Sequence, residues 1–510
     1  MPTASPLLRL RPDDDVAIAT RDLHRGEEFA LSDSSTLVVA STVPRAHKIA
    51  LRALGRGSAV RKYGQVIGVT TRDIAVGQPV HSHNLAFEPG SRDYEFGVDR
   101  PAIPTTMTGR TFDGYVRGDG RVGTRNAIGV ITSVNCSASS ARLIAGQFRG
   151  LGSADTEHVD GVMALTHGSG CGLVPGSEGG DTLLRTLRGY ARHPNFGGLL
   201  VLGLGCEMVP VAALVEDLNL PPDTVVETLN VQDLGGIRAT VRVGSERIRA
   251  MMPRVARARR EPVDISHLVL GLNCGGSDGY SGISANPALG YASDLLVGAG
   301  GTSVLAETPE IFGAEHLLTR RAATPEVGQA LLERLAWWQD YATAGGGTLD
   351  NNPSPGNKAG GLTTILEKSL GAVAKAGSAE LRAVYRYAEQ ITQRGLGFMD
   401  TPGYDPVSVT GLVAGGANLI CFTTGRGSVL GSKPAPTVKV ATNTPMYERM
   451  HEDMDLDAGR IVDGGATVEE VGEELFELLV DVASGRRRSV SEELDLGQDE
   501  FQPWQLGAVT

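Results

Sequence analysis

The sequence predicts an α/β protein with a small N-terminal β domain and a mostly parallel sheet in its C-terminal part. Three observations support this: short strand-type runs separated by turns over residues 12–88, apolar runs alternating with helical stretches after residue 111, and glycine-rich segments directly after the apolar runs. Strands and helices that alternate at this spacing form parallel sheets through right-handed crossovers. A chain of 510 residues is also too long for one hydrophobic core, so we expect several domains.

Residues 12–88 are expected to form the β domain. Four runs have the composition of strands: Val16–Ala19, Ser35–Val39, Val66–Val69 and Pro79–His81. Glycine-containing turns at residues 25–26, 63–64 and 76–77 separate them. Residues 89–110, with three prolines and little apolar periodicity, are interpreted as a linker.

Residues 111–260 and 264–485 each show the alternating pattern of an α/β domain. In the first, strands are expected at Ile128–Val134 and Leu199–Leu204, and helices at Ser139–Phe148 and Asp181–Tyr190. In the second, strands are expected at His267–Leu272, Thr302–Ala306 and Leu419–Phe422, and helices at Pro287–Ala299 and Val407–Gly415. This pattern predicts a Rossmann-like sheet over 264–485, followed by a tail over 486–510. Ligands bind beyond the carboxyl ends of such strands, where the glycine-rich loops 273–282 and 423–427 fall.

The composition, 41% hydrophobic and 21% charged, is that of a globular protein. A net charge of -12 gives no attraction for phosphate backbones, so nucleic acid is not an expected partner, although local Arg and Lys side chains can still bind a small anion. No run has the length of a membrane span and Met1–Asp15 lacks the features of a secretory signal, so no membrane association is expected. Five cysteines are too few for a disulfide framework and fit a reducing cytoplasm.

Four of the five cysteines lie in glycine-rich strand exits and are the weaker metal candidates: Cys136, Cys171, Cys206 and Cys274. A thiolate binds soft or borderline metals, and a strand exit would bring it to a pocket. For each cysteine alone, the better-supported explanation is a small, readily buried residue suited to a tight turn. No Cys-x-x-Cys pair of a zinc site is present.

His81 and His83 are the stronger metal candidates. On the predicted strand, residues i and i+2 face the same side, so both imidazoles could reach one divalent cation. His47, from the same small domain, is the candidate third ligand. The alternative is an ordinary pair of edge-strand residues.

Polar groups beside glycine turns are candidates for substrate binding. Arg125, followed by Asn126, could clamp a carboxylate with two parallel hydrogen bonds. A second turn is surrounded by Asn357, Lys358, Glu367 and Lys368. Arg426 lies in a third turn, which could hold an anion with backbone N–H groups. The third glycine and distal acid of a dinucleotide fingerprint are missing, so NAD is not an expected cofactor.

Together these motifs resemble the altronate/galactarate dehydratase family over nearly the whole chain. The matching runs are His47–Ala50, Val80–Asn84, Gly123–Asn126, Gly203–Glu207, Cys274–Asp278, Ser284–Pro287, Asn352–Gly361, Glu367–Ser369 and Thr424–Gly427. The resemblance implies an N-terminal SAF-like domain and loss of water from an aldonate or aldarate, giving a 2-keto-3-deoxy acid with the help of a divalent metal, typically Fe²⁺ or Mn²⁺. His47, His81, His83 and Lys368 are then general acid, base or ligand candidates. The partner is a sugar acid, and assembly into a homo-oligomer is left open.

Within this family the sequence is more similar to the altronate branch, at Glu307–Glu315 and His193–Asn195. Two segments depart from both branches. Gly427-Ser-Val-Leu-Gly431 replaces Gly-Thr-Pro-Tyr-Gly, and Ser169-Gly170 lacks an aromatic residue. Galactarate dehydration and sulfite elimination from sulfolactate therefore stay open as alternatives. A non-catalytic sugar-acid-binding protein would need the same anion loops without base or metal, and a nicotinamide dehydrogenase is the least supported class.

Overall fold

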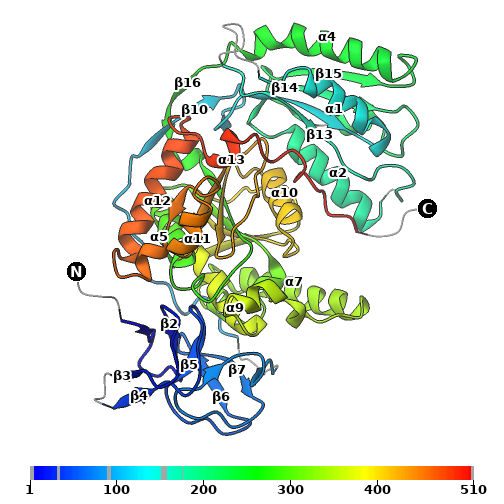
Figure 1. The fold of residues 1–510 in the computed structure, drawn as a ribbon. Coiled ribbons are helices and arrows are strands. Elements are labelled where there is room, and N and C mark those ends of the chain that lie inside the picture. Colours follow the sequence, from blue (N-terminus) through cyan, green and yellow to red (C-terminus); the bar gives the residue numbers. More distant parts are fainter. Residues whose placement is uncertain are drawn as a thin grey trace.

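The computed structural model describes residues 5–31, 35–88, 94–150, 158–174, 176–216 and 218–506. The N-terminal β domain lies at one end of the molecule, the central domain at the other, and the C-terminal domain between them (Figure 1). Residues 89–93 of the predicted linker lie outside the described residues, and 94–110 contain no helix or strand. Among the described residues, no helix is long and apolar enough to cross a membrane.

The N-terminal domain consists of short strands, as predicted, and these strands pair in an antiparallel arrangement. One sheet contains β1 (Leu7–Leu8), β2 (Val16–Ala19), β5 (Lys48–Ala50) and β8 (Pro79–Val80). A second contains β6 (Ala59–Lys62), β7 (Gln65–Thr70) and β9 (Leu85–Ala86), and β3 (Glu28–Ala30) pairs with β4 (Thr36–Val38). The apolar side chains that alternate along these strands fill small buried cores.

The prediction from sequence that His81 and His83 lie on a strand is wrong. β8 ends at Val80, and both histidines lie in the turn that leads to β9. Asn84 closes this turn: its side-chain oxygen accepts a hydrogen bond from the His81 N–H (2.8 Å), and its own N–H donates to the His81 carbonyl (2.9 Å). Asn side chains hydrogen-bond nearby backbone groups in this way and so favour turns over strands.

The central domain is a parallel sheet covered on both faces. Its strands, in the spatial order β13-β12-β14-β15, are β12 (Ala127–Thr132), β13 (Val162–Leu165), β14 (Phe196–Gly203) and β15 (Val225–Asn230). β14 is buried along its whole length, as expected for a parallel strand with helices on both sides. α1 (Ala138–Gly146) and α4 (Ile237–Val255) share one apolar core, and α2 (Glu178–Ala191) and α3 (Val211–Val215) belong to the other.

A short antiparallel sheet joins the central domain to the C-terminal domain. It contains β10 (Thr111–Val116), β11 (Val122–Gly123) and β16 (Arg260–Asp264). β10 lies just before the central domain in the sequence and β16 just after it. The segments by which the chain enters and leaves the central domain, β10 and β16, therefore lie side by side.

The C-terminal domain contains the predicted Rossmann-like sheet of seven parallel strands, in the order β19-β20-β18-β17-β21-β22-β23. The strands are β17 (Val269–Cys274), β18 (Thr302–Leu305), β19 (Leu381–Tyr385), β20 (Gly395–Met399), β21 (Leu419–Thr424), β22 (Thr437–Ala441) and β23 (Leu456–Asp457). α5 (Ala285–Gly298) and α12 (Val468–Ala483) cover one face and α10 (Asp405–Gly415) the other (Figure 1). The strand order reverses between β17 and β21, and ligands of such sheets bind at the carboxyl ends of the strands beside this point.

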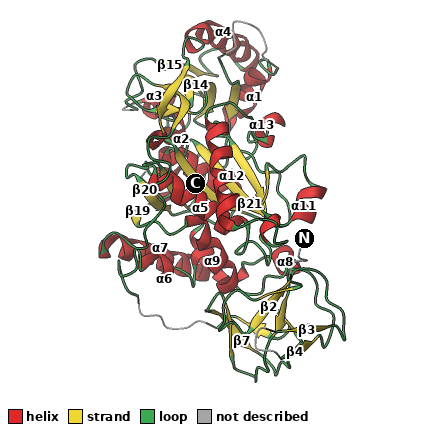
Figure 2. Ribbon diagram, turned by 90° about the vertical axis from the view of Figure 1, so that its left-hand side faces the viewer, coloured by secondary structure: helices red, strands yellow, loops and turns green. Residues whose placement is uncertain are grey.

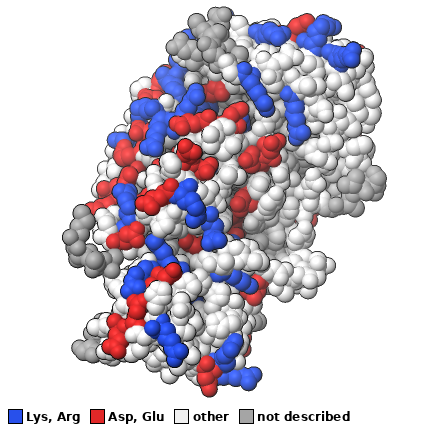
Figure 3. Space-filling view, in the orientation of Figure 1, with Lys and Arg blue, Asp and Glu red and all other residues white. Residues whose placement is uncertain are grey.

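The remaining helices lie at the edges of this sheet. Between β18 and β19 the chain forms α6 (His316–Thr319), α7 (Pro325–Ala344), α8 (Pro355–Ala359) and α9 (Ile365–Val373). α8 and α9 lie on the side of the N-terminal domain (Figure 2). α11 (Thr444–Arg449) follows β22, and α13 (Val490–Glu493) lies in the segment predicted as a tail. On the face shown in Figure 3, basic side chains are interspersed with acidic ones.

Candidate active site

The N-terminal domain contacts the loops that follow β17 and α8. The carbonyl oxygen of Ala46 lies so close that a Cβ on Gly279 would come within 2.1 Å of it, and a Cβ on Gly361 within 2.3 Å. The Ala46 N–H donates to the Tyr280 hydroxyl (3.1 Å), which donates to the Ala19 carbonyl (2.6 Å). Glycines in these loops therefore allow two backbones from different domains to approach each other.

A buried carboxylate between two lysines lies at this contact. Glu367, in the first turn of α9, accepts hydrogen bonds from Lys48 (2.8 Å) and Lys62 (2.8 Å), which both belong to the N-terminal domain. Thr363 donates to the same carboxylate through its N–H (3.0 Å) and its hydroxyl (2.7 Å). Burial acts to raise the pKa of Glu367, but the two ammonium groups outweigh it and hold that pKa well below its ordinary value. In this structure Glu367, a predicted substrate ligand, joins two domains.

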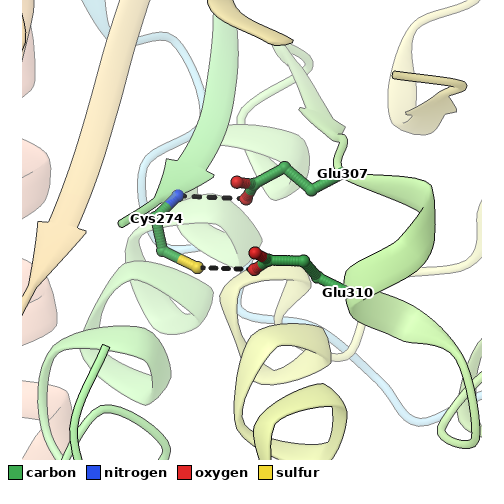
Figure 4. A group of neighbouring side chains, drawn as sticks. All are labelled: Cys274, Glu307 and Glu310. Atoms are coloured by element: carbon green, nitrogen blue, oxygen red, sulfur yellow. Dashed lines mark hydrogen bonds between the residues drawn. The ribbon is translucent and has the colours of Figure 1, made fainter. Parts of the chain in front are cut away.

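A second buried cluster lies where β17 and β18 end. Cys274 is the last residue of β17, and Glu307 and Glu310 follow β18 with their carboxyl groups pointing toward Cys274 (Figure 4). Glu307 accepts a hydrogen bond from the Cys274 N–H (3.0 Å), and the thiol lies 3.5 Å from Glu310 Oε2. Each residue offers one ligand atom within 4.8 Å of the other two. Within the described part of the chain, this is the one group of His, Cys, Asp or Glu side chains with such spacing.

Two lysines balance the charge of this acid–thiol cluster (Cys274, Glu307 and Glu310). Lys375 donates to Glu307 (2.6 Å) and lies 2.9 Å from the Cys274 sulfur. Lys368 pairs with Glu310. Burial acts to lower the pKa of Lys368, but Glu310 and Cys274 outweigh it, so the pKa is raised and the lysine holds its proton. In this state Lys368 is suited to act as an acid or as a fixed positive charge.

Both the backbone conformation of Glu307 and the burial of its carboxylate are energetically unfavourable. Its backbone is left-handed, with φ 69° and ψ 64°, and Oε1 is buried without a hydrogen-bond partner among the described residues. Each feature costs on the order of 1–3 kcal/mol, and such strain clusters at functional sites. Burial raises the pKa of Glu307, and it raises the pKa of Asp405 to about 7. Asp405 is adjacent, since a Cβ on Gly275 would come within 2.2 Å of its carboxylate. Acids that titrate near neutrality are typical of active sites.

Two cations without ion-pair partners lie nearer the surface. Lys358 is half-buried and Arg426 is exposed, and neither side chain forms a hydrogen bond or ion pair within the residues that the structure describes. Both lie beside Gly360, where an added Cβ would be 3.3 Å from Arg426 Cδ and 3.0 Å from the Cβ of the buried Asp278. Such unpaired cations can bind a carboxylate.

The three predicted histidine ligands lie together. The rings of His47 and His81 stack with centroids 5.1 Å apart, and those of His81 and His83 are 6.5 Å apart. Burial lowers the pKa of each histidine, so all three are neutral near pH 7. Neutral imidazoles can serve as metal ligands or as bases.

The hydrogen bonds of His47 and His81 determine which ring nitrogens are free. A carbonyl can only accept, so His81 Nε2 donates to the Lys358 carbonyl (2.9 Å), and Nδ1 is the acceptor that faces the Ser82 hydroxyl (3.0 Å). His47 Nδ1 donates to the Arg45 carbonyl (3.0 Å) for the same reason. The lone pair of His47 Nε2 is therefore available to a proton or a metal, whereas His81 uses both nitrogens.

Arg125 and Asn126 make their contacts within the protein. Arg125 forms two bonds with Glu492 of α13 (2.6 and 2.8 Å), which fastens the central domain to the C-terminal segment. The Asn126 amide donates to the carbonyls of His158 (2.7 Å) and Val255 (3.0 Å). Their predicted role as a substrate clamp finds no support in these contacts.

The other predicted residues divide between the C-terminal domain and the central domain. Asn357 forms a capping box with Ser354 at α8 and donates to the Ser277 carbonyl (2.9 Å), close to the acid–thiol cluster. Cys136, Cys171 and Cys206 are exposed and lie in the central domain, whereas Cys274 is buried.

The candidates from sequence did not include several residues of these clusters, namely Lys48, Lys62, Glu307, Glu310, Lys375 and Asp405. Glu307 and Glu310 directly follow a strand, which is the position that singled out the cysteines. The three lysines carried no signal, because fully buried lysines are rare and their partners are distant in sequence.

Comparisons with known proteins agree with this architecture. Residues 5–88 match the altronate/galactarate dehydratase SAF domain, residues 114–256 the second domain of D-galactarate dehydratase/altronate hydrolase, and residues 265–509 the C-terminal domain of D-galactarate/altronate dehydratase.

Individual relatives are similar over almost the whole chain. Altronate dehydratase of Escherichia coli (strain K12) is 37% identical over 485 residues, which cover 94% of this chain and 95% of that protein. Altronate dehydratase of Bacillus subtilis (strain 168) is 36% identical over 484 residues, with the same coverage. Galactarate dehydratase (L-threo-forming) of E. coli (strain K12) is 36% identical over 507 residues, 96% of this chain and 95% of that protein. The chain therefore belongs to the altronate/galactarate dehydratase family, as its motifs predicted.

Proposed function

We propose that the protein is a metal-dependent hydro-lyase that removes water from a hexonate of the altronate type and yields a 2-keto-3-deoxy acid. The main support is the carboxyl end of the C-terminal sheet beside its switch point, where a buried set of acids and lysines lies and where the side chains of Lys358 and Arg426 have no ion-pair partner among the described residues. The altronate and galactarate dehydratases among the relatives support the reaction class.

The chemistry requires a base, an acid and stabilisation of negative charge. Removal of the proton next to a carboxylate leaves an enediolate, and the departing hydroxide must be protonated. Lys358 and Arg426 are suited to hold the substrate carboxylate. His47 Nε2 has the free lone pair of a base, and the protonated Lys368 is suited to donate a proton or to stabilise the enediolate.

A divalent metal would act as a Lewis acid on the substrate oxygens. The acid–thiol cluster has ligand spacing for one ion, and its oxygen and sulfur donors suit Fe²⁺ or Mn²⁺. The ammonium groups of Lys375 and Lys368 would have to move away from the carboxylates of Glu307 and Glu310. His47, with His81 and His83, is the alternative donor set, although His81 would first have to release the Lys358 carbonyl.

A substrate screen tests the reaction. Hexonates and hexarates are incubated with the enzyme and Fe²⁺ or Mn²⁺, and 2-keto-3-deoxy products are measured. Altronate should give the highest kcat/KM. Preference for galactarate would assign the other branch, release of sulfite from sulfolactate would assign the sulfo-lyase reaction, and binding without product would support a non-catalytic protein.

Substitutions test the position of the substrate carboxylate. Arg426→Leu and Lys358→Met each remove a charged hydrogen-bond donor worth about 1.5–3 kcal/mol, so KM should rise roughly 10- to 100-fold with little change in Tm. Arg449→Leu, an exposed arginine on α11, is the matched control and should leave KM unchanged. Unchanged KM in both site variants would place the carboxylate elsewhere.

A further inference from the structure

Three exposed cysteines lie at one edge of the central sheet, at the opposite end of the molecule from the N-terminal domain. Cys136 follows β12, Cys171 follows β13 and Cys206 follows β14, and these strands are neighbours in the order β13-β12-β14. All three side chains are exposed, whereas Cys274 and Cys421 are buried. Free cysteine is among the most often buried residue types, so three exposed ones at consecutive strand ends are unusual.

Direct hydrogen bonds hold the loops of Cys136 and Cys171 together. Asn135, the neighbour of Cys136, donates its N–H to the Ser169 carbonyl (2.9 Å) and its side-chain amide to the His167 carbonyl (3.0 Å). Gly170 has a φ of 101°, and a Cβ there would come within 2.5 Å of the Ser133 carbonyl oxygen. The two cysteine loops are thus in backbone contact.

A buried carboxylate fixes the third loop. Glu207, next to Cys206, accepts a hydrogen bond from the Ser133 hydroxyl (2.8 Å) and another from the Gly205 N–H (2.7 Å). Gly205 has a φ of 120°, which turns the chain sharply before Cys206. Gln232 donates to the Cys206 sulfur (3.4 Å). The three thiols are therefore presented on one pre-formed edge.

We propose that Cys136, Cys171 and Cys206 bind an iron–sulfur cluster in which one iron has no cysteine ligand. Neighbouring strands lie about 4.8 Å apart, so the ends of three consecutive strands spread over about 10 Å, and the cysteines lie three to six residues beyond those ends. A single ion with metal–sulfur bonds of about 2.3 Å would require the sulfurs to lie within roughly 4.6 Å of each other. Among the described residues these sulfurs do not form a group with all members within 4.8 Å. Several irons bridged by sulfide span the longer distance, and cysteine thiolates are their usual ligands.

A cavity lies beside this edge of the sheet. Its volume is about 520 Å³, and Asn135, Gly168 and His167, which belong to the loops of Cys136 and Cys171, contribute to its wall. Arg142 of α1 and Asp499 also line it, so its wall contains one charged group of each sign. The iron without a cysteine ligand would take water or an anionic oxygen ligand from this cavity.

Reconstitution under anaerobic conditions tests the proposal. The full-length protein is incubated with Fe²⁺, sulfide and a thiol reductant, and desalted. Bound iron and acid-labile sulfide, visible absorbance and the electron paramagnetic resonance spectrum of the reduced sample are then measured. We expect equimolar iron and sulfide, several of each per chain, with the visible absorbance of a cluster. Each of the three single variants Cys136→Ser, Cys171→Ser and Cys206→Ser should lose most of the bound iron and sulfide. Their circular dichroism spectra should be unchanged, because the substituted side chains are exposed.

Cys421→Ala, at a buried cysteine in β21, is the matched control and should keep the full iron and sulfide content. The proposal is wrong if the three serine variants retain sulfide and absorbance, if the parent binds iron without sulfide, or if no iron is bound. The readouts do not depend on dehydratase activity, so either result leaves the proposed function to its own tests.

Discussion

Replacing Glu367 by glutamine removes the one negative charge between Lys48 and Lys62. Both lysine side chains are at most 1% exposed and the carboxylate is fully buried, so water cannot replace the lost partner. Removing one member of a buried ion pair costs about 3–5 kcal/mol. Burial already lowers the pKa of Lys48 to about 8, so this lysine can give up its proton at little further cost at alkaline pH. The lower end, about 3 kcal/mol, is therefore expected near pH 8.

The predicted loss concerns the contact between the N-terminal and C-terminal domains. Hydrogen–deuterium exchange, followed by mass spectrometry, reports this contact through peptides from residues 5–88. A loss of about 3 kcal/mol should speed exchange there by roughly 100-fold where the exchange rate is set by the equilibrium between closed and open states. Glu474→Gln, at an exposed pair with Arg460, is the control and should change exchange little. Combining Lys62→Met with Glu367→Gln should recover part of the loss.

The effect should also depend on pH. In the variant, both lysines are buried without a counter-charge, so the unfolded state binds more protons than the folded state and stability rises with pH. The pKa of Glu367 in the parent is lowered, so its contribution is fully present above the ordinary value of about 4.3 and is lost only as pH falls through the lower folded value. The difference between parent and variant should therefore be larger at pH 6 than at pH 9. Equal hydrogen–deuterium exchange in parent and variant at both pH 6 and pH 9 would refute the inference that Glu367 links these domains.

Three further predictions concern the site itself. A chelator should abolish turnover, and Fe²⁺ or Mn²⁺ should restore it; full activity of the metal-stripped enzyme would contradict the proposed metal dependence. His47→Ala should lower kcat at least 10-fold with an unchanged Tm. Asp405→Asn should raise Tm more at pH 8 than at pH 5, because burial raises the pKa of Asp405 to about 7, so the parent loses stability progressively as pH rises from the ordinary value of about 3.9 to about 7; equal gains would argue against this. Val429, in the loop after Arg426, is 64% exposed, while Leu430 is buried, so the single substitution Val429→Tyr tests whether this loop contacts the substrate. The ratio of the kcat/KM values for altronate and galactarate should change, and an unchanged ratio would place the loop away from the substrate.

The fold could be predicted from the sequence because its signals are local. The continuous apolar run of β14 indicated a strand buried on both faces, and the alternation of such runs with helices indicated parallel sheets. The glycine-rich loops after β17 and β21 lie at the carboxyl edge of the C-terminal sheet, as the sequence predicted, and Cys274, one of the candidates, lies at that edge. Motifs dispersed over the chain were sufficient for the family.

The partners of the charged residues were decided by tertiary structure alone. Glu367 and Lys48 are 319 positions apart, and their contact exists only because Ala46 fits against glycines of another domain. Arg125 had the local setting of an anion clamp, yet α13 brings Glu492 to it from 367 positions away. The sequence placed His81 and His83 on a strand because the short run Pro79–His81 has the composition of one. In the structure the Asn84 side chain closes a turn there. Periodicity and turn chemistry act between near neighbours and can be read from sequence, but the pairing of buried charges depends on which distant surfaces exclude water together, and only the packed domains determine that.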